Sequence, residues 1–377
     1  MAKKTSKKMA TDAAPRPLLV KEWAASIGIK KAARSTKAFE MQVGNIILPK
    51  EYRGKAKVST DKKTGSIQII VKSSQPGIHV FPPDIKSVKL SRSTLKGAEA
   101  AYQTEGILPK HLGLSQFPKT LDKKLVVKQM FGLDEKKLLR LKRDVPTTIF
   151  PPDSRYIFSD TSFPWCTCGK VETAGGSGSG VMIGPRHMMT ASHVINWGPN
   201  NTAGWVKFTP LKFDTSEPFG NAFATLIYSW NKADGSDGLD TNEEAFDYVV
   251  CVLDHAMGNT TGWMGSRGYN TGWDNGDYWG HIGYPADLGS ANRPVFIGYQ
   301  SFFGEDTGSE AGRSAYRIKH KIDVIPGQSG GPYFGWWDSE PWPRVVGIQS
   351  GQNASFNVCG GGNPLSELIN YARTQMP

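Results

Sequence analysis

The sequence predicts an all-β fold for residues 144–377, preceded by a basic N-terminal region over residues 1–143. From residue 145 onward, short apolar segments alternate with clusters of Gly, Asn, Asp and Pro, and no long helical pattern appears before residue 364. Charge sets the boundary, because residues 1–143 carry 31 basic and 11 acidic side chains and residues 144–377 carry 14 and 23. The two parts therefore have net charges of +20 and −9, and the basic character of the chain belongs to its first part.

The first region divides into three parts by composition. Residues 1–40 are rich in Lys and Ala and are expected to be disordered, whereas residues 41–90 contain alternating segments, such as 66–72, that predict a small β-rich module. Residues 121–143 are rich in Leu, Lys and Glu and predict one short basic helix that ends at the dibasic pair 142–143. A dibasic pair in a polar junction is typical of proteolytic processing sites. We therefore predict cleavage near residues 143–145 and interpret residues 1–143 as a pro-region.

Lysine-rich arms also bind phosphate backbones, so a nucleic-acid-binding function is an alternative for this region. The lysines are not interleaved with aromatic residues, and no zinc-finger, helix-turn-helix or RNA-binding motif is present. We therefore favour a cationic pro-segment that docks on the acidic remainder, and we expect no nucleic-acid partner. The N-terminus has no apolar run typical of a secretory signal, and no stretch is typical of a membrane span.

The second region has the composition of a compact domain, with ten of the eleven tryptophans and all four cysteines. The cysteines are Cys166, Cys168, Cys251 and Cys359. Two disulfides and buried free thiols both remain open, while zinc is disfavoured because no His lies at ligand spacing. Residues 363–373 begin with Asn-Pro and place apolar residues at helical spacing, which predicts a C-terminal helix.

Residues that form a hydrolytic triad occur in three separate segments. His193 follows a Thr-Ala-Ser run, Asp247 begins an apolar strand, and Ser329 lies in a Gly-rich loop. A serine hydroxyl becomes a good nucleophile when an imidazole takes its proton, and the imidazole needs a buried carboxylate to hold its tautomer. Asp240 and Asp254 compete for the carboxylate role, but the first lies in a Gly- and Asp-rich loop and the second at the far end of the strand.

The glycines around Ser329 predict a site for negative charge. Gly327, Gly330 and Gly331 allow the backbone to bend tightly around the serine. We expect the N–H groups of Gly327 and Ser329 to form an oxyanion hole there.

Residues 150–372 resemble the chymotrypsin-fold serine proteases, in particular the glutamyl-endopeptidase-like branch of bacteria and fungi. The motifs that carry the resemblance are Gly178-Ser-Gly-Val, Thr190-Ala-Ser-His-Val, Phe246-Asp-Tyr-Val-Val, Ile282-Gly-Tyr-Pro-Ala, Pro326-Gly-Gln-Ser-Gly-Gly-Pro and Val346-Gly-Ile-Gln-Ser-Gly. The resemblance implies two six-stranded antiparallel barrels with the triad in the cleft between them, and chemistry without a cofactor or metal. It also implies a monomeric, extracellular enzyme that acts on protein or peptide substrates.

Two departures from the family pattern bear on activation and specificity. Trypsin-like zymogens carry an Asp before the nucleophile that pairs with the amine released by activation, whereas this chain has Gln328, so activation must work in another way. Glutamyl endopeptidases carry a His where this chain has Gln349. Asp323, six residues before Ser329, occupies the position of the carboxylate in the trypsin pocket.

The resemblance makes four residues candidates for substrate binding: Asp323, Gln349, Ser350 and Gly351. The preference between acidic and basic residues at the cleaved bond stays open. The alternative function is a catalytically inactive binding protein with the protease fold. The complete triad argues against it, because such proteins usually lose the His or the Ser.

Overall fold

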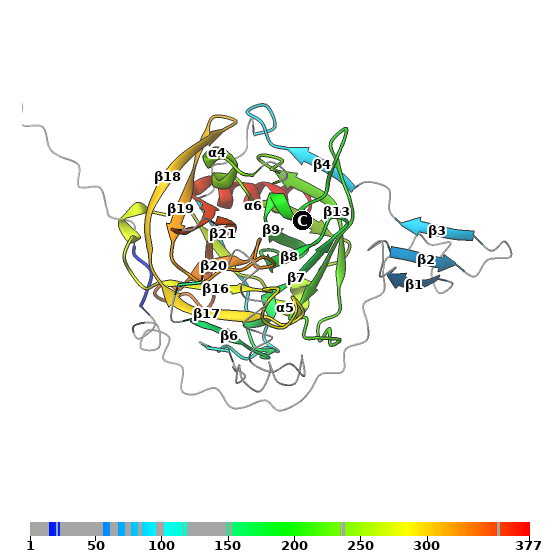
Figure 1. Ribbon diagram of the computed structural model, residues 1–377, viewed down its shortest axis with the longest axis horizontal. Coiled ribbons are helices and arrows are strands. Elements are labelled where there is room, and N and C mark those ends of the chain that lie inside the picture. Colours follow the sequence, from blue (N-terminus) through cyan, green and yellow to red (C-terminus); the bar gives the residue numbers. More distant parts are fainter. Residues whose placement is uncertain are drawn as a thin grey trace, which may run out of the picture.

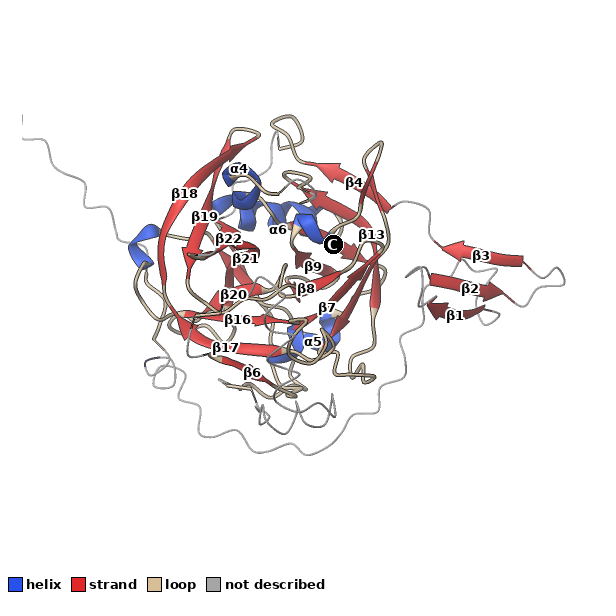
Figure 2. Cartoon of the chain, in the orientation of Figure 1, coloured by secondary structure: helices blue, strands red, loops and turns tan. Residues whose placement is uncertain are grey.

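The computed structural model describes residues 15–19, 22, 56–60, 67–71, 77–81, 85–95, 102–115, 117–118, 149–150, 153–233, 235, 238–352 and 355–377 (Figure 1). The predicted helix over 121–143 and the predicted processing site at 143–145 lie outside these residues. The all-β prediction is confirmed, because strands dominate the described chain and helices are few and short (Figure 2). None of these helices has the length and apolar character needed to cross a membrane.

A nine-stranded sheet builds the first lobe. Its hydrogen-bonded order is β10 (Trp197–Gly198), β11 (Thr202–Ala203), β4 (Ile85–Lys89), β13 (Ala222–Ser229), β12 (Val206–Pro210), β7 (Cys168–Thr173), β8 (Ser177–Met182), β9 (His187–Thr190) and β14 (Val249–Leu253). Pairing of β13 with β14 closes the last six of these strands into a barrel. This is the first of the two barrels that the resemblance implied.

A second sheet builds the other lobe and contains the serine loop. Its order is β18 (Phe302–Glu310), β19 (Arg313–His320), β22 (Asn357–Gly361), β21 (Arg344–Gln352), β20 (Pro332–Gly335), β16 (Trp279–Gly283), β17 (Val295–Gln300) and β6 (Arg155–Ile157). In addition, β15 (Gly265–Arg267) pairs with both β21 and β5 (Gln103–Thr104). A separate antiparallel sheet is formed by β1 (Ala56–Thr60), β2 (Ile67–Val71) and β3 (Gly77–Phe81). The segment 66–72 predicted as a strand coincides with β2.

From residue 153 onward, the described helices lie in short connections and at the C-terminus. They are α4 (Thr241–Ala245), α5 (Gly258–Thr261), α6 (Asn363–Gln375) and the 3₁₀ turns η2 (Trp165–Thr167), η3 (Ser192–Val194) and η4 (Thr271–Trp273). The predicted C-terminal helix is thus confirmed as α6, with Pro364 in its first turn as helix starts favour. Leu365, Leu368 and Ile369 of this helix are buried in a core shared by both lobes.

The strand β14 shows how the sequence pattern produces this packing. All five of its residues are buried, because both faces of the strand are covered. Alternate side chains of a strand point to opposite faces: Val249 and Cys251 fill the barrel interior, whereas Val250 and Val252 join the core shared with α6. An uninterrupted apolar run is therefore required here, and it holds Asp247 at the edge of a rigid element.

All four cysteines are free and buried, so the thiol alternative is the one found. Burial raises the pKa of Cys168 and of Cys251 to about 12, which keeps both thiols protonated. Within the described part of the chain, no three His, Cys, Asp or Glu side chains gather as a metal site would require.

Candidate active site

His193 and Asp247 meet at the end of the first barrel. His193 lies in η3, which follows β9, and Asp247 lies two residues before the start of β14, the strand paired with β9. The ring Nδ1 of His193 lies 2.5 Å from Asp247 Oδ2, and its backbone N–H donates to Oδ1 at 2.9 Å. The aspartate thus fixes both the backbone and the ring of the histidine, as a triad requires.

Asp247 has no solvent exposure and receives a third hydrogen bond, from the Ser350 hydroxyl at 2.6 Å. Three donors satisfy a carboxylate that burial would otherwise destabilise. Ser350 comes from β21 of the second lobe, so this bond joins the two lobes at Asp247. The resemblance made Ser350 a candidate for substrate binding, whereas in the structure its hydroxyl donates to the carboxylate of Asp247.

The pKa of His193 reflects this environment. Burial lowers the pKa of the imidazole, but the charge of Asp247 and the hydrogen bond to it outweigh burial and raise the pKa above the ordinary value of 6.5. The imidazolium form is thereby stabilised, which suits a base that must carry a proton during the reaction.

Ser329 lies in a sharply bent loop between β19 and β20. Gly327 and Gly330 have φ values of +100° and +83°, and a Cβ on Gly327 would lie 2.4 Å from the Tyr284 carbonyl oxygen. Only glycine fits these two positions. Among the described residues, the N–H groups of Gly327 and Ser329 donate to no other protein group, so both are free to bind an oxyanion.

Ser179 of β8 joins this loop to the first barrel. Its backbone N–H donates to the Ser329 carbonyl at 2.7 Å, and its hydroxyl donates to the Gly327 carbonyl at 2.8 Å. The Ser179 hydroxyl also accepts from the Tyr284 amide at 2.9 Å. The Gly-Ser-Gly-Val motif contributed to the resemblance, but nothing in the sequence indicated that Ser179 would bond to the loop that carries Ser329.

His193 and Ser329 line one cleft of about 500 Å³. Its remaining walls are Gly175, Gly176, Ser177, Val194, Ile195, Asn196, Trp197, Pro326 and Gly327. The cleft therefore brings together residues from both lobes, including the predicted base and the predicted nucleophile.

The two competing aspartates have other partners. Asp240 caps helix α4, where its side chain accepts from the Glu243 amide at 2.8 Å. Asp254 lies 2.7 Å from the ring of His255, beyond the far end of β14. Neither carboxylate is hydrogen-bonded to His193.

Asp323 binds the chain itself. Its side chain is 2% exposed, and it accepts from the Phe150 amide, the Ser154 amide and the Ser154 hydroxyl, each at 2.8 Å. Both carboxylate oxygens are therefore occupied. In this structure Asp323 is bonded to Phe150 and Ser154 of the segment that follows the predicted processing junction, and it does not line the cleft that contains His193 and Ser329.

Gln349 is also internally satisfied. Its amide oxygen accepts from the Tyr333 hydroxyl at 2.6 Å, and its amide nitrogen donates to the Gly351 carbonyl at 3.0 Å. The rings of His281 and His320 lie against Tyr333. Burial lowers the pKa of both histidines, that of His281 to about 3, so this group of side chains is uncharged near neutral pH.

Gln328 occupies the position that holds an Asp in trypsin-like zymogens. It is fully buried, and its amide oxygen accepts from the Ile325 amide at 3.0 Å. Its amide nitrogen lies 3.5 Å from the Asp323 carbonyl oxygen. The residue before the nucleophile is thus held by its own loop without an ion pair.

No family model matches the sequence. Over 191 residues the chain is 26% identical to the glutamyl endopeptidase of Bacillus licheniformis. This alignment covers 50% of this chain and 55% of that protein. The chain thus spans little more than half the length of this relative. Among solved structures, a Glu endopeptidase in complex with MPD has a TM-score of 0.49 at 19% identity, covering 60% of this chain and all of that one. The protease Anisep from Arthrobacter nicotinovorans has a TM-score of 0.39 at 20% identity, covering 57% and 98%.

Proposed function

We propose that this chain, which is similar to the glutamyl-endopeptidase-like serine proteases of chymotrypsin fold, is a serine endopeptidase with His193, Asp247 and Ser329 as its triad. One observation carries the proposal: a histidine oriented by a buried aspartate shares a cleft with a serine whose loop presents two free amides. This combination activates a nucleophile and stabilises the charge that its attack creates.

In the proposed reaction, the Asp247 bond to Nδ1 leaves Nε2 of His193 to take the proton from Ser329 Oγ. The oxygen attacks the substrate carbonyl carbon, and the resulting oxyanion accepts hydrogen bonds from the amides of Gly327 and Ser329. His193 then gives its proton to the leaving amine, which breaks the peptide bond and leaves an acyl-enzyme. A water molecule, deprotonated by His193, hydrolyses this ester and regenerates the serine.

The glutamyl name of the relative makes acidic preference the first hypothesis for specificity. Here Gln349 is neutral and both its amide oxygen and its amide nitrogen are bonded to protein atoms, while Asp323 is bound by backbone and hydroxyl donors. We infer that neither side chain selects substrates by a free charge. A peptide library that varies the residue before the cleaved bond would measure the preference.

We also propose that the chain is made as a precursor cleaved near residues 143–145. The charge break and the dibasic pair support this position. The hydrogen bond from the Phe150 amide to Asp323 also supports it. A chain end created by the cleavage would be only a few residues before Phe150, which is bonded to the loop that carries Ser329.

Labelling with a fluorophosphonate probe tests the assignment of the nucleophile, since only an activated serine reacts with it. We expect the protein to be labelled and Ser329→Ala to lose the label. Ser309→Ala, on an exposed strand end away from the cleft, is the matched control and should be labelled as the parent is. Absence of labelling in the processed parent would instead favour the catalytically inactive binding protein.

A further inference from the structure

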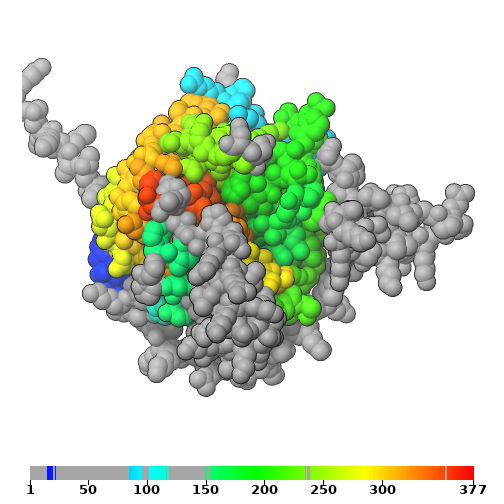
Figure 3. Space-filling model, in the orientation of Figure 1, coloured from blue at the N-terminus to red at the C-terminus, as the bar shows by residue number. Residues whose placement is uncertain are grey.

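The segment formed by residues 85–95, 102–115, 117 and 118 precedes the predicted junction and is built into both lobes. In the first lobe, β4 lies between two other strands: it runs parallel to β13, with Lys86 opposite Leu226, and antiparallel to β11. The Leu90 amide donates to the Ser229 carbonyl at 2.7 Å, and the Leu90 side chain is 1% exposed in the shared core. Part of this segment, coloured cyan, lies at the top of the molecule in Figure 3.

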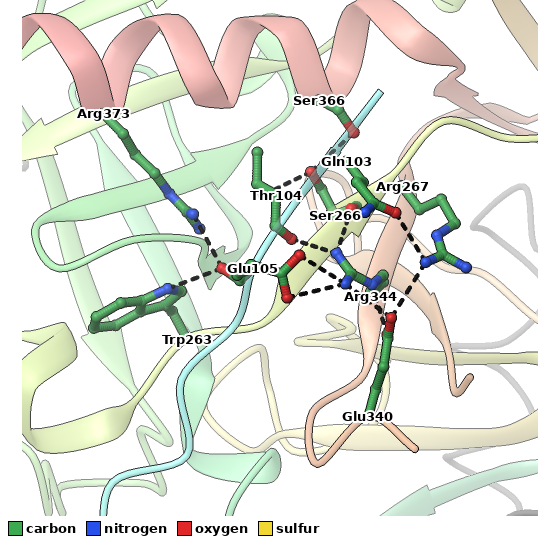
Figure 4. Close-up of polar contacts among 10 residues, drawn as sticks. All are labelled: Gln103, Thr104, Glu105, Trp263, Ser266, Arg267, Glu340, Arg344, Ser366 and Arg373. Atoms are coloured by element: carbon green, nitrogen blue, oxygen red, sulfur yellow. Dashed lines mark hydrogen bonds and ion pairs between the residues drawn. The ribbon is translucent and has the colours of Figure 1, made fainter. Parts of the chain in front are cut away.

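The same segment continues into the second lobe at β5 (Figure 4). The hydroxyls of Thr104, Ser266 and Ser366 form a buried chain, with oxygen separations of 2.8 and 2.9 Å. This chain links the segment through β15 to helix α6. Because a buried hydroxyl without a partner is destabilising, loss of Thr104 would leave Ser266 short of one of its two hydroxyl partners.

Two arginines, Arg344, which is buried, and Arg373, which is partly exposed, depend on the segment as well. Arg344 is 2% exposed; it donates to the Thr104 carbonyl at 2.6 Å and to the two Glu105 carboxylate oxygens at 3.0 and 3.1 Å. Arg373 and the Trp263 indole both donate to the Glu105 carbonyl, at 3.0 and 3.2 Å. Removal of the segment would deprive a buried guanidinium of several acceptors, which is costly even though Glu340 would remain.

The fit is close beyond these polar contacts. A Cβ on Gly106 would lie 2.6 Å from Trp342 Cγ and 2.7 Å from the Gly265 amide nitrogen, so the segment packs directly on the backbone of β15. Ile107 and Trp263 exchange a pair of backbone hydrogen bonds of 2.9 and 3.1 Å. Farther along, Phe117 packs edge to face on two aromatic rings of the second lobe.

We infer that residues 85–95, 102–115, 117 and 118 are a permanent part of the folded protein, and that the N-terminal fragment stays bound as a noncovalent second chain after cleavage near residues 143–145. The inference rests on the proposed cleavage, but not on the proposed chemistry. The segment is held by strand pairing, by the buried side chains of Leu90 and Leu95, and by the hydrogen bonds from Arg344 to Thr104 and Glu105. Few ion pairs are described between this segment and the rest of the protein. One of them joins Lys89 to Glu310 at 3.4 Å, and it lies at the surface because the lysine side chain is 43% exposed.

Cleavage of the full chain in the Ser329→Ala background tests this without any contribution from peptidase activity. A recognition sequence for a site-specific protease is placed after Arg143, the chain is cut, and native size-exclusion chromatography follows. We expect both fragments to elute together, to stay together in about 1 M salt, which screens surface charge strongly, and to separate in guanidinium chloride. Separation in native buffer, whatever then becomes of the larger fragment, would overturn the inference.

Two glycine substitutions provide a matched pair for the same experiment. Gly106→Ala places a methyl group into the backbone of β15, whereas Gly113→Ala places it where no atom lies within 4 Å. We expect the N-terminal fragment to dissociate about tenfold or more faster from the cut Gly106→Ala protein, and at the parent rate from the cut Gly113→Ala protein. Equal dissociation rates for the two variants would show that this segment does not hold the fragment.

Discussion

The hydrogen bonds to Asp247 come from three directions: the His193 backbone, the His193 ring and the Ser350 hydroxyl. They orient the carboxylate so that one oxygen faces the imidazole. An amide at this position would place an N–H₂ group toward a ring nitrogen or a donor, and would favour the wrong histidine tautomer. A side chain of the same shape therefore cannot replace Asp247 unless both of its terminal atoms accept hydrogen bonds, as those of a carboxylate do.

Replacement of Asp247 by Asn should lower turnover by roughly 10³–10⁴. Asp254→Asn is the matched control, because this carboxylate is bonded to His255 at the other end of the strand. Turnover of both variants on one peptide, with the melting temperature as a check on folding, measures the effect. A larger loss in Asp254→Asn would mean that the wrong carboxylate has been assigned.

The pH dependence should report the state of His193. The protonated imidazole cannot accept the serine proton, so kcat/KM should rise with pH and reach half its maximum above pH 6.5, where the raised pKa lies. Asp247→Asn removes the charge that raises the pKa, so the residual activity of this variant should reach half-maximum at lower pH. An inflection that moves to higher pH in the variant would contradict this electrostatic account.

Asp323 illustrates what the sequence alone did not resolve at this scale. Its spacing from Ser329 indicated a pocket carboxylate, but spacing does not reveal that the Phe150 and Ser154 donors occupy both of its oxygens. By contrast, the three residues proposed as the triad each lie in a local motif, and it was the conjunction of these motifs that indicated them. The difference is that a motif encodes its own backbone geometry, whereas the partner of a buried carboxylate comes from a distant part of the chain.

Asp323→Asn should therefore lower kcat/KM for all peptides by a similar factor, because it loosens the 150–154 segment beside the serine loop. A pocket carboxylate would behave differently: its loss would impair cleavage after Lys or Arg alone. The measurement compares kcat/KM for matched peptides with Lys, Glu and Leu before the cleaved bond. A selective loss with the Lys peptide would restore the role of specificity residue.

At the scale of elements, the backbone around Ser329 is fixed by conformations that only glycine adopts readily. Gly327→Ala would place a methyl group 2.4 Å from the Tyr284 carbonyl at a φ of +100°. We expect it to displace the oxyanion amides and lower kcat by about 10²-fold or more. Gly298→Ala, on β17 with no atom within 4 Å of the new methyl, should leave kcat unchanged. Equal kcat values for the two variants would remove Gly327 from the oxyanion hole.

The strands were predictable from sequence where their pattern is local. The apolar run of β14 and the Asn-Pro start of α6 were both evident, although the N-cap of α6 is Gly362 and no side chain caps the helix. The pairing of β4 and β5 with the two lobes was not, because strand partners of a segment at residue 85 or 103 are chosen by edges that form more than a hundred residues later. Charge composition, which placed the boundary after residue 143, describes the surface and does not report strand pairing.

At the scale of the whole molecule, the N-terminal region combines two features that normally exclude each other. Its basic composition and dibasic pair are typical of a removable pro-segment, whereas residues 85–95 and 102–115 supply strands and buried side chains to both lobes. Both can hold if cleavage at the junction changes the chain ends without releasing the fragment. Activation would then be a local event near Phe150, about 20 Å or less of extended chain from the cut.

We therefore predict that the uncut full-length chain is latent, and that cutting at 143–145 raises turnover while the N-terminal fragment stays bound. A free chain end near Phe150 could settle beside Asp323, whose loop leads to Gln328 and Ser329. The trypsin-type ion pair is unavailable because Gln328 is neutral, which leaves this segment as the route of activation. Turnover of one peptide is measured before and after cutting, with N-terminal sequencing of both samples. The variant with Lys142→Gln and Arg143→Gln serves as the uncut control. Equal turnover of the intact and cut proteins, with the intact chain confirmed after the assay, would show that the junction does not control activity.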